Sequence, residues 1–469
     1  MNKVPRNKKT PKVIPKTPKP LSKRQALAVS VAVGVVGGIL LSVHLFANSA
    51  GPLGGATVPL RIPAANIGDN DDVAHSQSST QKETTHSPRS LRAIDVIGAE
   101  GIRLDKARIV DGKYRQTLDD GRVVTFTLNP AVQQRAQQLL EENAVPYGAV
   151  VAIDPRDGRV LALASYSSAE PNRPVAFSAS QPAASVFKVV SAAALLEFGN
   201  ISPDDSICYH GGRRGISEAL LNPNPKLDTA CNTLAEAIAE STNVVFARMA
   251  DQHLDVPKLT EVAERFGFGE PVPFAWAVEP SRVSLPQKRV EFAGAAAGFH
   301  HSTLSPLHAA VMMAGIANDG EMPEPEIVES VDHGGVFTYR AERRVWKRAS
   351  SAEHARKLTE MMVLTTVRGT ATKYFSKRGP GLDGVTVAGK TGSLSSENGG
   401  VVRHNSWFVG FAPADKPEIA IAALVVNDPK WRIKGTLLAR QVLETYFTEV
   451  RAAASVGRDP SDKVKGDRR

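Results

Sequence analysis

The strongest constraint on this 469-residue chain is a lysine that must be buried, in the segment Ser185-Val-Phe-Lys188. A serine and a lysine three residues apart lie on one face of a helix. Apolar residues continue from Val186 to Leu196, which predicts a buried helix, and Pro182 suits its first turn. Burial lowers the pKa of a lysine, and only a neutral amine can take the proton of a serine hydroxyl. The segment therefore predicts Ser185 as a nucleophile and Lys188 as its general base.

Two shorter motifs follow, Ser241-Thr-Asn243 and Lys390-Thr-Gly392. Each motif is weak alone, because Ser79-Thr-Gln-Lys82 and Ser396-Glu-Asn398 repeat two of the patterns elsewhere in the chain. The stretch around Ser79 is polar and has no helical period, so we interpret that copy as chance. The ordered triple is far more specific, and it matches the signature of serine acyltransferases that recognise penicillin.

The segment from about residue 125 to 450 resembles the transpeptidase domain of penicillin-binding proteins. Besides the three motifs, the resemblance rests on Gly369-Thr-Ala371 and on Trp407-Phe-Val-Gly-Phe-Ala-Pro413. Residues 127–136 and 148–155 resemble the entry to this domain in the bifunctional class A branch. We expect no glycosyltransferase domain, because residues 48–125 are too few to hold one, and no class B pedestal domain.

The resemblance implies an α+β fold of the penicillin-binding and serine β-lactamase type. In this fold an antiparallel sheet is flanked by helices and accompanied by a helical subdomain. The hydrophobic pattern agrees, because it predicts strands at both ends of the domain around a helical middle. The predicted strands are a hairpin at 148–165 and single strands at 385–389, 406–411 and 419–426, with helices at 130–143 and 435–450.

The resemblance also implies roles for the first two motifs. Ser185 would attack the carbonyl carbon of a D-Ala–D-Ala stem peptide, and Lys188 would accept the serine proton. Ser241 would relay a proton to the leaving D-Ala. Asn243 would hold Lys188 and the amide of the substrate.

The third motif supplies the predicted substrate-binding residues Thr391, Gly392 and Ser393. Lys390 and Thr391 would hold the terminal carboxylate of the substrate. The backbone N–H groups of Ser185 and Ser393 would surround the oxyanion. The resemblance implies no metal and no cofactor. It implies stem peptides, β-lactams and a membrane as partners, and it leaves open whether a separate glycan polymerase is another.

Two other classes of function stay open. One is a hydrolytic relative, which would be a carboxypeptidase, an endopeptidase, a β-lactamase or a β-lactam sensor. The other is a non-catalytic scaffold of a cell-wall complex. A nucleotide-binding protein is a weaker alternative, although residues 384–391 match the phosphate-loop pattern. We expect a strand at 385–389 and a loop at 392–400, whereas a phosphate loop would open a helix.

The N-terminal region decides the predicted topology. Residues 1–25 hold nine Lys or Arg residues and no acidic residue, and removing them leaves 48 basic against 48 acidic residues. The net charge of +9 therefore indicates a cytoplasmic flank and not a nucleic-acid-binding surface. Residues 26–46 carry no charge and are long enough to span a bilayer. We expect a single-pass anchor in a bacterial inner membrane with the catalytic domain outside the cytoplasm; a cleaved signal is the alternative.

These features divide the chain into six predicted parts. They are a basic cytoplasmic tail (1–25), a transmembrane anchor (26–46), a flexible linker (47–95), a short β-rich lead-in (96–126), the transpeptidase domain (127–451) and a disordered tail (452–469).

Three further features are ambiguous in the sequence. Cys208 and Cys231 are the only cysteines, and outside the cytoplasm they either form a disulfide or remain as two buried thiols. The pattern Glu218-x-x-x-Asn222 mimics the deacylation motif of class A β-lactamases, but it precedes Ser241, so we interpret it as coincidence. His300 and His301 replace a polar run of the family, and loop packing is the simpler explanation for them.

Overall fold

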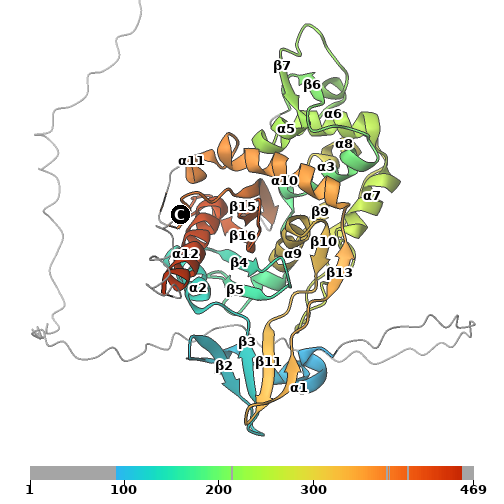
Figure 1. Cartoon of the computed structure of the whole chain (residues 1–469). Helices are drawn as coiled ribbons and strands as arrows, with labels where there is room; N and C mark the ends of the chain where they lie inside the picture. The colour runs from blue at the N-terminus through green and yellow to red at the C-terminus, as the bar shows by residue number, and fades with distance from the viewer. Residues whose placement is uncertain (1–90, 213–214, 377–378, 380, 399–400, 457–469) are drawn as a thin grey trace, which may run out of the picture. The chain divides into compact units, whose positions relative to one another are not determined.

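The computed structural model describes residues 91–212, 215–376, 379, 381–398 and 401–456 (Figure 1). Its main sheet is antiparallel and has the strand order β14-β15-β16-β4-β5. The strands are β4 (Tyr147–Ile153), β5 (Val160–Tyr166), β14 (Ala388–Asn398), β15 (Val401–Ala412) and β16 (Ile419–Asn427). Because the first two strands lie far from the last three in the sequence, the predicted split sheet and the α+β class are confirmed.

The main sheet is covered on both faces, because β4 and β16 are buried at every position. The odd-numbered residues of β4 belong to one hydrophobic cluster, and Val150 and Ala152 belong to another. This is the two-residue alternation of a strand. One face packs against α9 (Pro306–Ala317). The other packs against α2 (Pro130–Glu142) and α12 (Gly435–Val456), which lie together in Figure 1.

The helical subdomain lies between the two groups of strands in the sequence. Its helices are α3 (Lys188–Glu197), α4 (Glu218–Leu221), α5 (Leu234–Glu240), α6 (Asn243–His253), α7 (Val256–Arg265), α8 (Arg289–Ala296), α10 (Ala352–Val367) and α11 (Thr372–Phe375). The central helix is α3, which contacts α5, α6, α7 and α10. All of its residues before Glu197 are buried, including Lys188. The predicted buried helix is therefore confirmed.

A small hairpin of β6 (Ser206–Tyr209) and β7 (Ala230–Thr233) also belongs to this subdomain. Cys208 and Cys231 are opposite each other across the two strands and form a disulfide. Both cysteines are exposed, so of the two alternatives from the sequence the disulfide is the one that the structure contains.

A second five-stranded sheet has the order β1-β2-β3-β11-β12, with α1 (Ala93–Gly101) against β11 and β12 (Figure 1). The strands are β1 (Arg108–Val110), β2 (Lys113–Thr117), β3 (Val123–Phe126), β11 (Val328–His333) and β12 (Val336–Arg340). The predicted lead-in thus supplies three strands, and the predicted transpeptidase range supplies the other two. The first helix, α1, begins inside the predicted linker, and the last helix, α12, continues to Val456.

Three local predictions were wrong. The strand expected at 385–389 begins only at Ala388, and the loop expected at 392–400 is strand as far as Asn398. Its polar residues resemble a loop in the sequence, but their backbone groups pair with β15 throughout. Pro182 does not open the helix: it forms an isolated bridge with Thr303, and α3 begins at Lys188.

Among the described residues, no helix has both the length and the apolar character needed to cross a bilayer. The predicted tail (1–25), the predicted anchor (26–46) and the Ser79 motif lie outside the described residues.

Candidate active site

Ser185 lies in a single 3₁₀ turn, Ala184–Val186, directly before α3. Ala184 has a φ of +50°, a left-handed conformation that is strained for alanine. The turn is fastened by its neighbours: the Ala183 N–H donates to the Ser302 carbonyl at 3.1 Å, and the Trp407 indole donates to the Pro182 carbonyl at 3.0 Å. The nucleophile is therefore held by two elements that are distant in the sequence.

The Lys188 amine is fully buried and surrounded by oxygen atoms. Its Nζ lies 2.7 Å from Asn243 Oδ1, 2.5 Å from the Ala297 carbonyl oxygen and 3.0 Å from Ser185 Oγ. The two carbonyl oxygens can only accept hydrogen bonds, so they occupy both N–H groups of a neutral amine. The lone pair of the amine then faces the Ser185 hydroxyl, as general-base chemistry requires.

The electrostatics favour a neutral Lys188. Burial, followed by the nearby charge of Lys390, holds the pKa of Lys188 well below its usual range. Burial also lowers the pKa of Lys390 to about 7. Within the described part of the chain, no carboxylate forms an ion pair with either amine. The cost of desolvating the two charges is therefore not offset.

Ser241 connects the helices that carry the second motif. Helix α5 begins with a capping box between Thr233 and Glu236, and Ser241 ends it in a left-handed conformation with φ +58°. Lys390 Nζ donates to Ser241 Oγ at 2.9 Å and to the Thr391 carbonyl at 2.9 Å. Lys390 is thus joined to Ser241 in the same way that Lys188 is joined to Ser185.

The third motif lies on β14, the edge strand of the main sheet. A side chain at Gly392 would meet Val186 and the Ala183 carbonyl, so this glycine packs directly against the turn of the nucleophile. Ser393 follows on the same strand and is exposed. The structure therefore brings together the predicted catalytic and substrate-binding residues, which are Ser185, Lys188, Ser241, Asn243, Lys390, Thr391, Gly392 and Ser393.

A model of the penicillin-binding protein transpeptidase domain matches residues 148–444. The chain belongs to this family. It is 28% identical over 389 residues to the peptidoglycan D,D-transpeptidase PbpA of Mycobacterium tuberculosis, with 75% of each protein covered. The D,D-transpeptidase domain of a peptidoglycan glycosyltransferase from Eggerthella lenta is 27% identical, with a TM-score of 0.59 over 73% of this chain and 96% of that domain.

A ceftriaxone acyl-enzyme complex of penicillin-binding protein A from M. tuberculosis is similar in fold as well. It is 26% identical, with a TM-score of 0.57 over 69% of this chain and 79% of that protein. The resemblance to penicillin-binding proteins found in the sequence is therefore confirmed, as is the fold.

Several groups around the transpeptidase site were not identified from the sequence. The Ala297 carbonyl is one, since a backbone acceptor leaves no signature. Arg248 of α6 is another: it is buried and donates to Asp228 and to the carbonyls of Cys208, Leu220 and Asn222. These bonds tie the disulfide hairpin to the helix that begins at Asn243. An arginine in an apolar helical run was the available signal.

The ambiguous motifs lie outside this constellation. Glu218 forms an ion pair with Arg289, as expected for a coincidental match. Ser396 accepts a hydrogen bond from Asn405. His300 and His301 are exposed in a loop. The phosphate-loop alternative is wrong, because Lys390 lies inside a strand that continues to Asn398 and opens no helix. No group of metal-binding side chains occurs among the residues that the structure describes.

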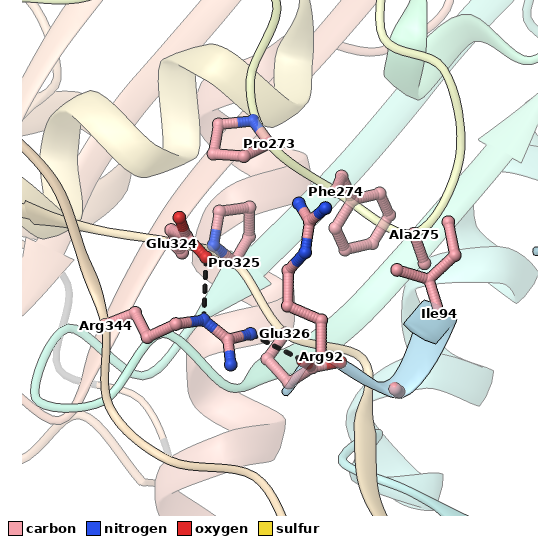
Figure 2. A pocket seen from close by; sticks show the side chains of 10 residues that line it. Arg92, Ile94, Pro273, Phe274, Ala275, Glu324, Pro325, Glu326 and Arg344 are labelled. Atoms are coloured by element: carbon pink, nitrogen blue, oxygen red, sulfur yellow. Dashed lines mark hydrogen bonds and ion pairs between the residues drawn. The ribbon is translucent and has the colours of Figure 1, made fainter. Parts of the chain in front are cut away.

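A small cavity between α1 and the loop around Phe274 is not a second candidate for the active site (Figure 2). Its volume is about 20 Å³, roughly the space of one water molecule. Figure 2 shows Arg344 bonded to Glu324 and Glu326, at 2.7 and 3.1 Å. The acidic groups of this cavity are therefore already paired, and it is too small for a peptide.

Proposed function

We propose that this protein is a serine D,D-transpeptidase that cross-links peptidoglycan stem peptides through an acyl-enzyme on Ser185. The arrangement around Lys188 carries the proposal. A buried, neutral amine with both N–H groups occupied and its lone pair toward Ser185 Oγ is suited to remove the serine proton. The relatives that are named D,D-transpeptidases, and the acyl-enzyme complex of one of them, support the same assignment.

In the first half-reaction, Ser185 Oγ bonds to the carbonyl carbon between the two D-Ala residues while its proton passes to Lys188 Nζ. The backbone N–H groups of Ser185 and Ser393 hold the oxyanion. When the C–N bond breaks, the leaving D-Ala takes the Ser241 hydroxyl proton. Lys390 then returns a proton to Ser241, to which it is hydrogen-bonded. A pKa of about 7 suits Lys390 to this exchange near neutral pH.

The second half-reaction reverses these transfers. The amine of an acceptor strand attacks the ester carbonyl carbon and gives a proton to the Ser241–Lys390 pair. The C–O bond of the ester breaks, and Lys188 returns its proton to Ser185. Both lysines then have their initial protonation states. A β-lactam undergoes the first half-reaction and remains attached to Ser185.

The placement of the enzyme is a separate part of the proposal. Residues 1–25 form a cytoplasmic tail, 26–46 an anchor in the inner membrane, and 47–95 a linker. The lead-in (96–126), the catalytic domain (127–451) and the tail (452–469) lie outside the cytoplasm, where a separate polymerase supplies the glycan. Protease added to intact spheroplasts is expected to digest epitopes after residue 100. Full protection of these epitopes would contradict this placement.

The test of the reaction is product analysis with a donor stem peptide and an acceptor amine. Wild-type protein is expected to release D-Ala and to form the donor–acceptor amide, and Ser185→Ala is expected to form neither product. Release of D-Ala with water as the only acceptor would replace transpeptidation by carboxypeptidation. A Ser185→Ala protein with wild-type activity would refute the assignment.

A further inference from the structure

We propose that Thr370 is a second hydroxyl donor to the terminal carboxylate of the substrate and acts together with Thr391. The inference rests on the proposed function, and it names a residue outside the three motifs. It would give the enzyme its preference for peptides that end in a free carboxylate over peptide bonds inside a chain.

Thr370 is fixed by the element that carries Ser241. Its backbone N–H donates to the carbonyl of Ala239, in the last turn of α5, at 3.0 Å, and its hydroxyl lies 3.3 Å from the same oxygen. Gly369 packs so closely on this carbonyl that a Cβ would clash with it. The turn between α10 and α11 is therefore held next to Ser241, and Gly369 makes this close approach possible.

The hydroxyl oxygens of Thr370 and Thr391 are 2.6 Å apart, although the residues belong to different elements. Thr370 is exposed and Thr391 is half-buried, so a ligand can reach the pair. The spacing of the pair is similar to that of the two oxygens of a carboxylate. Each hydroxyl has one proton to donate and rotates freely, so both protons can turn from their present acceptors to a carboxylate. Hydrogen bonds to a charged acceptor are the stronger kind.

The surroundings make these hydroxyl donors important. Lys390 is buried, and its amine is directed to Ser241 Oγ and to the Thr391 carbonyl. Because burial lowers its pKa to about 7, Lys390 carries only part of a positive charge near neutral pH. Recognition of an anion at this site therefore depends on neutral donors, and Thr370 doubles their number.

The experiment compares acylation of Ser185 by a penicillin, which has a free carboxylate, with acylation by the methyl ester of the same penicillin. Thr370→Val is expected to slow acylation by the acid about 10- to 100-fold, the effect of a lost hydrogen bond to a charged group. Acylation by the ester is expected to change less than about threefold, because the ester carries no charge. Thr370→Ser keeps the hydroxyl and is expected to behave as wild type.

Thr372→Val is the matched control, because the Thr372 hydroxyl donates to the Gly369 carbonyl of the same turn at 2.8 Å. It is expected to leave the acid-to-ester ratio unchanged. An equal loss for acid and ester in Thr370→Val, or an equal change of the ratio in Thr372→Val, would overturn the role of Thr370. If Thr370→Val does not fold, Thr370→Ala makes the same comparison. If neither compound acylates the wild-type protein, the proposed function itself is wrong.

Discussion

Replacing Asn243 by Asp tests whether Lys188 is neutral when it acts. The substitution keeps the shape of the side chain but puts a negative charge where Asn243 Oδ1 now lies, 2.7 Å from Lys188 Nζ. An opposite charge at this range favours the protonated amine and shifts its pKa by about 1–3 units. We therefore expect the pKa of Lys188 to rise by that amount in Asn243→Asp.

The assay is the rate of acylation of Ser185 by a chromogenic β-lactam, measured across the pH range in which the protein stays folded. The wild-type rate is expected to rise with pH as Lys188 loses its proton. The midpoint in Asn243→Asp is expected to lie about 1–3 pH units higher. At one unit below the wild-type midpoint the variant is then slower by about 10- to 1000-fold, and it recovers at high pH. Lys390 titrates in both proteins and does not change the comparison.

Asn222→Asp is the control, because it makes the same chemical change in an exposed side chain whose partner is Arg289. Its midpoint is expected to equal that of the wild type. If Asn243→Asp loses the same factor at every pH, with no shift of the midpoint, Lys188 does not act as a neutral base and this reasoning is wrong.

Three further predictions concern stability. Trp407→Phe leaves the Pro182 carbonyl without its donor and is expected to lower the free energy of unfolding by about 1–3 kcal/mol and to slow acylation; exposed Trp431→Phe is the control, with unfolding followed in urea. Burial lowers the pKa of His308 from 6.5 to about 4, so the unfolded chain binds the proton first. The contribution of neutral His308 is complete above pH 6.5 and is lost between pH 6.5 and 4, about 3 kcal/mol in total, which a His308→Phe variant should not show. Reduction of the Cys208–Cys231 disulfide is expected to cost about 3 kcal/mol, measured against the double serine variant.

Much of the fold could be predicted because its signals are local. The continuous apolar runs of β4 and β16 indicate strands buried on both faces. The spacing of Ser185 and Lys188 in an apolar run indicates a base within reach of a nucleophile. By contrast, β14 was assigned too short a length, because pairing with β15, and not hydrophobicity, makes its polar half a strand.

The rest of the site could not be predicted, since it depends on contacts between distant parts of the chain. The Ala297 carbonyl reaches Lys188 across 109 residues, and as a backbone group it has no signature in the sequence. The pair of Thr370 and Thr391 needs both the turn after α10 and the edge strand in place. Threonines are too common for the sequence to indicate which two of them meet.

The most direct test of the central claim is mass spectrometry of the protein after exposure to a penicillin. We predict one penicilloyl group, on the peptide that contains Ser185. We predict no adduct in folded Ser185→Ala and an unchanged adduct in Ser79→Ala, where the sequence repeats the Ser-x-x-Lys pattern. A penicilloyl mass on any other residue, or undiminished labelling of Ser185→Ala, would contradict the account.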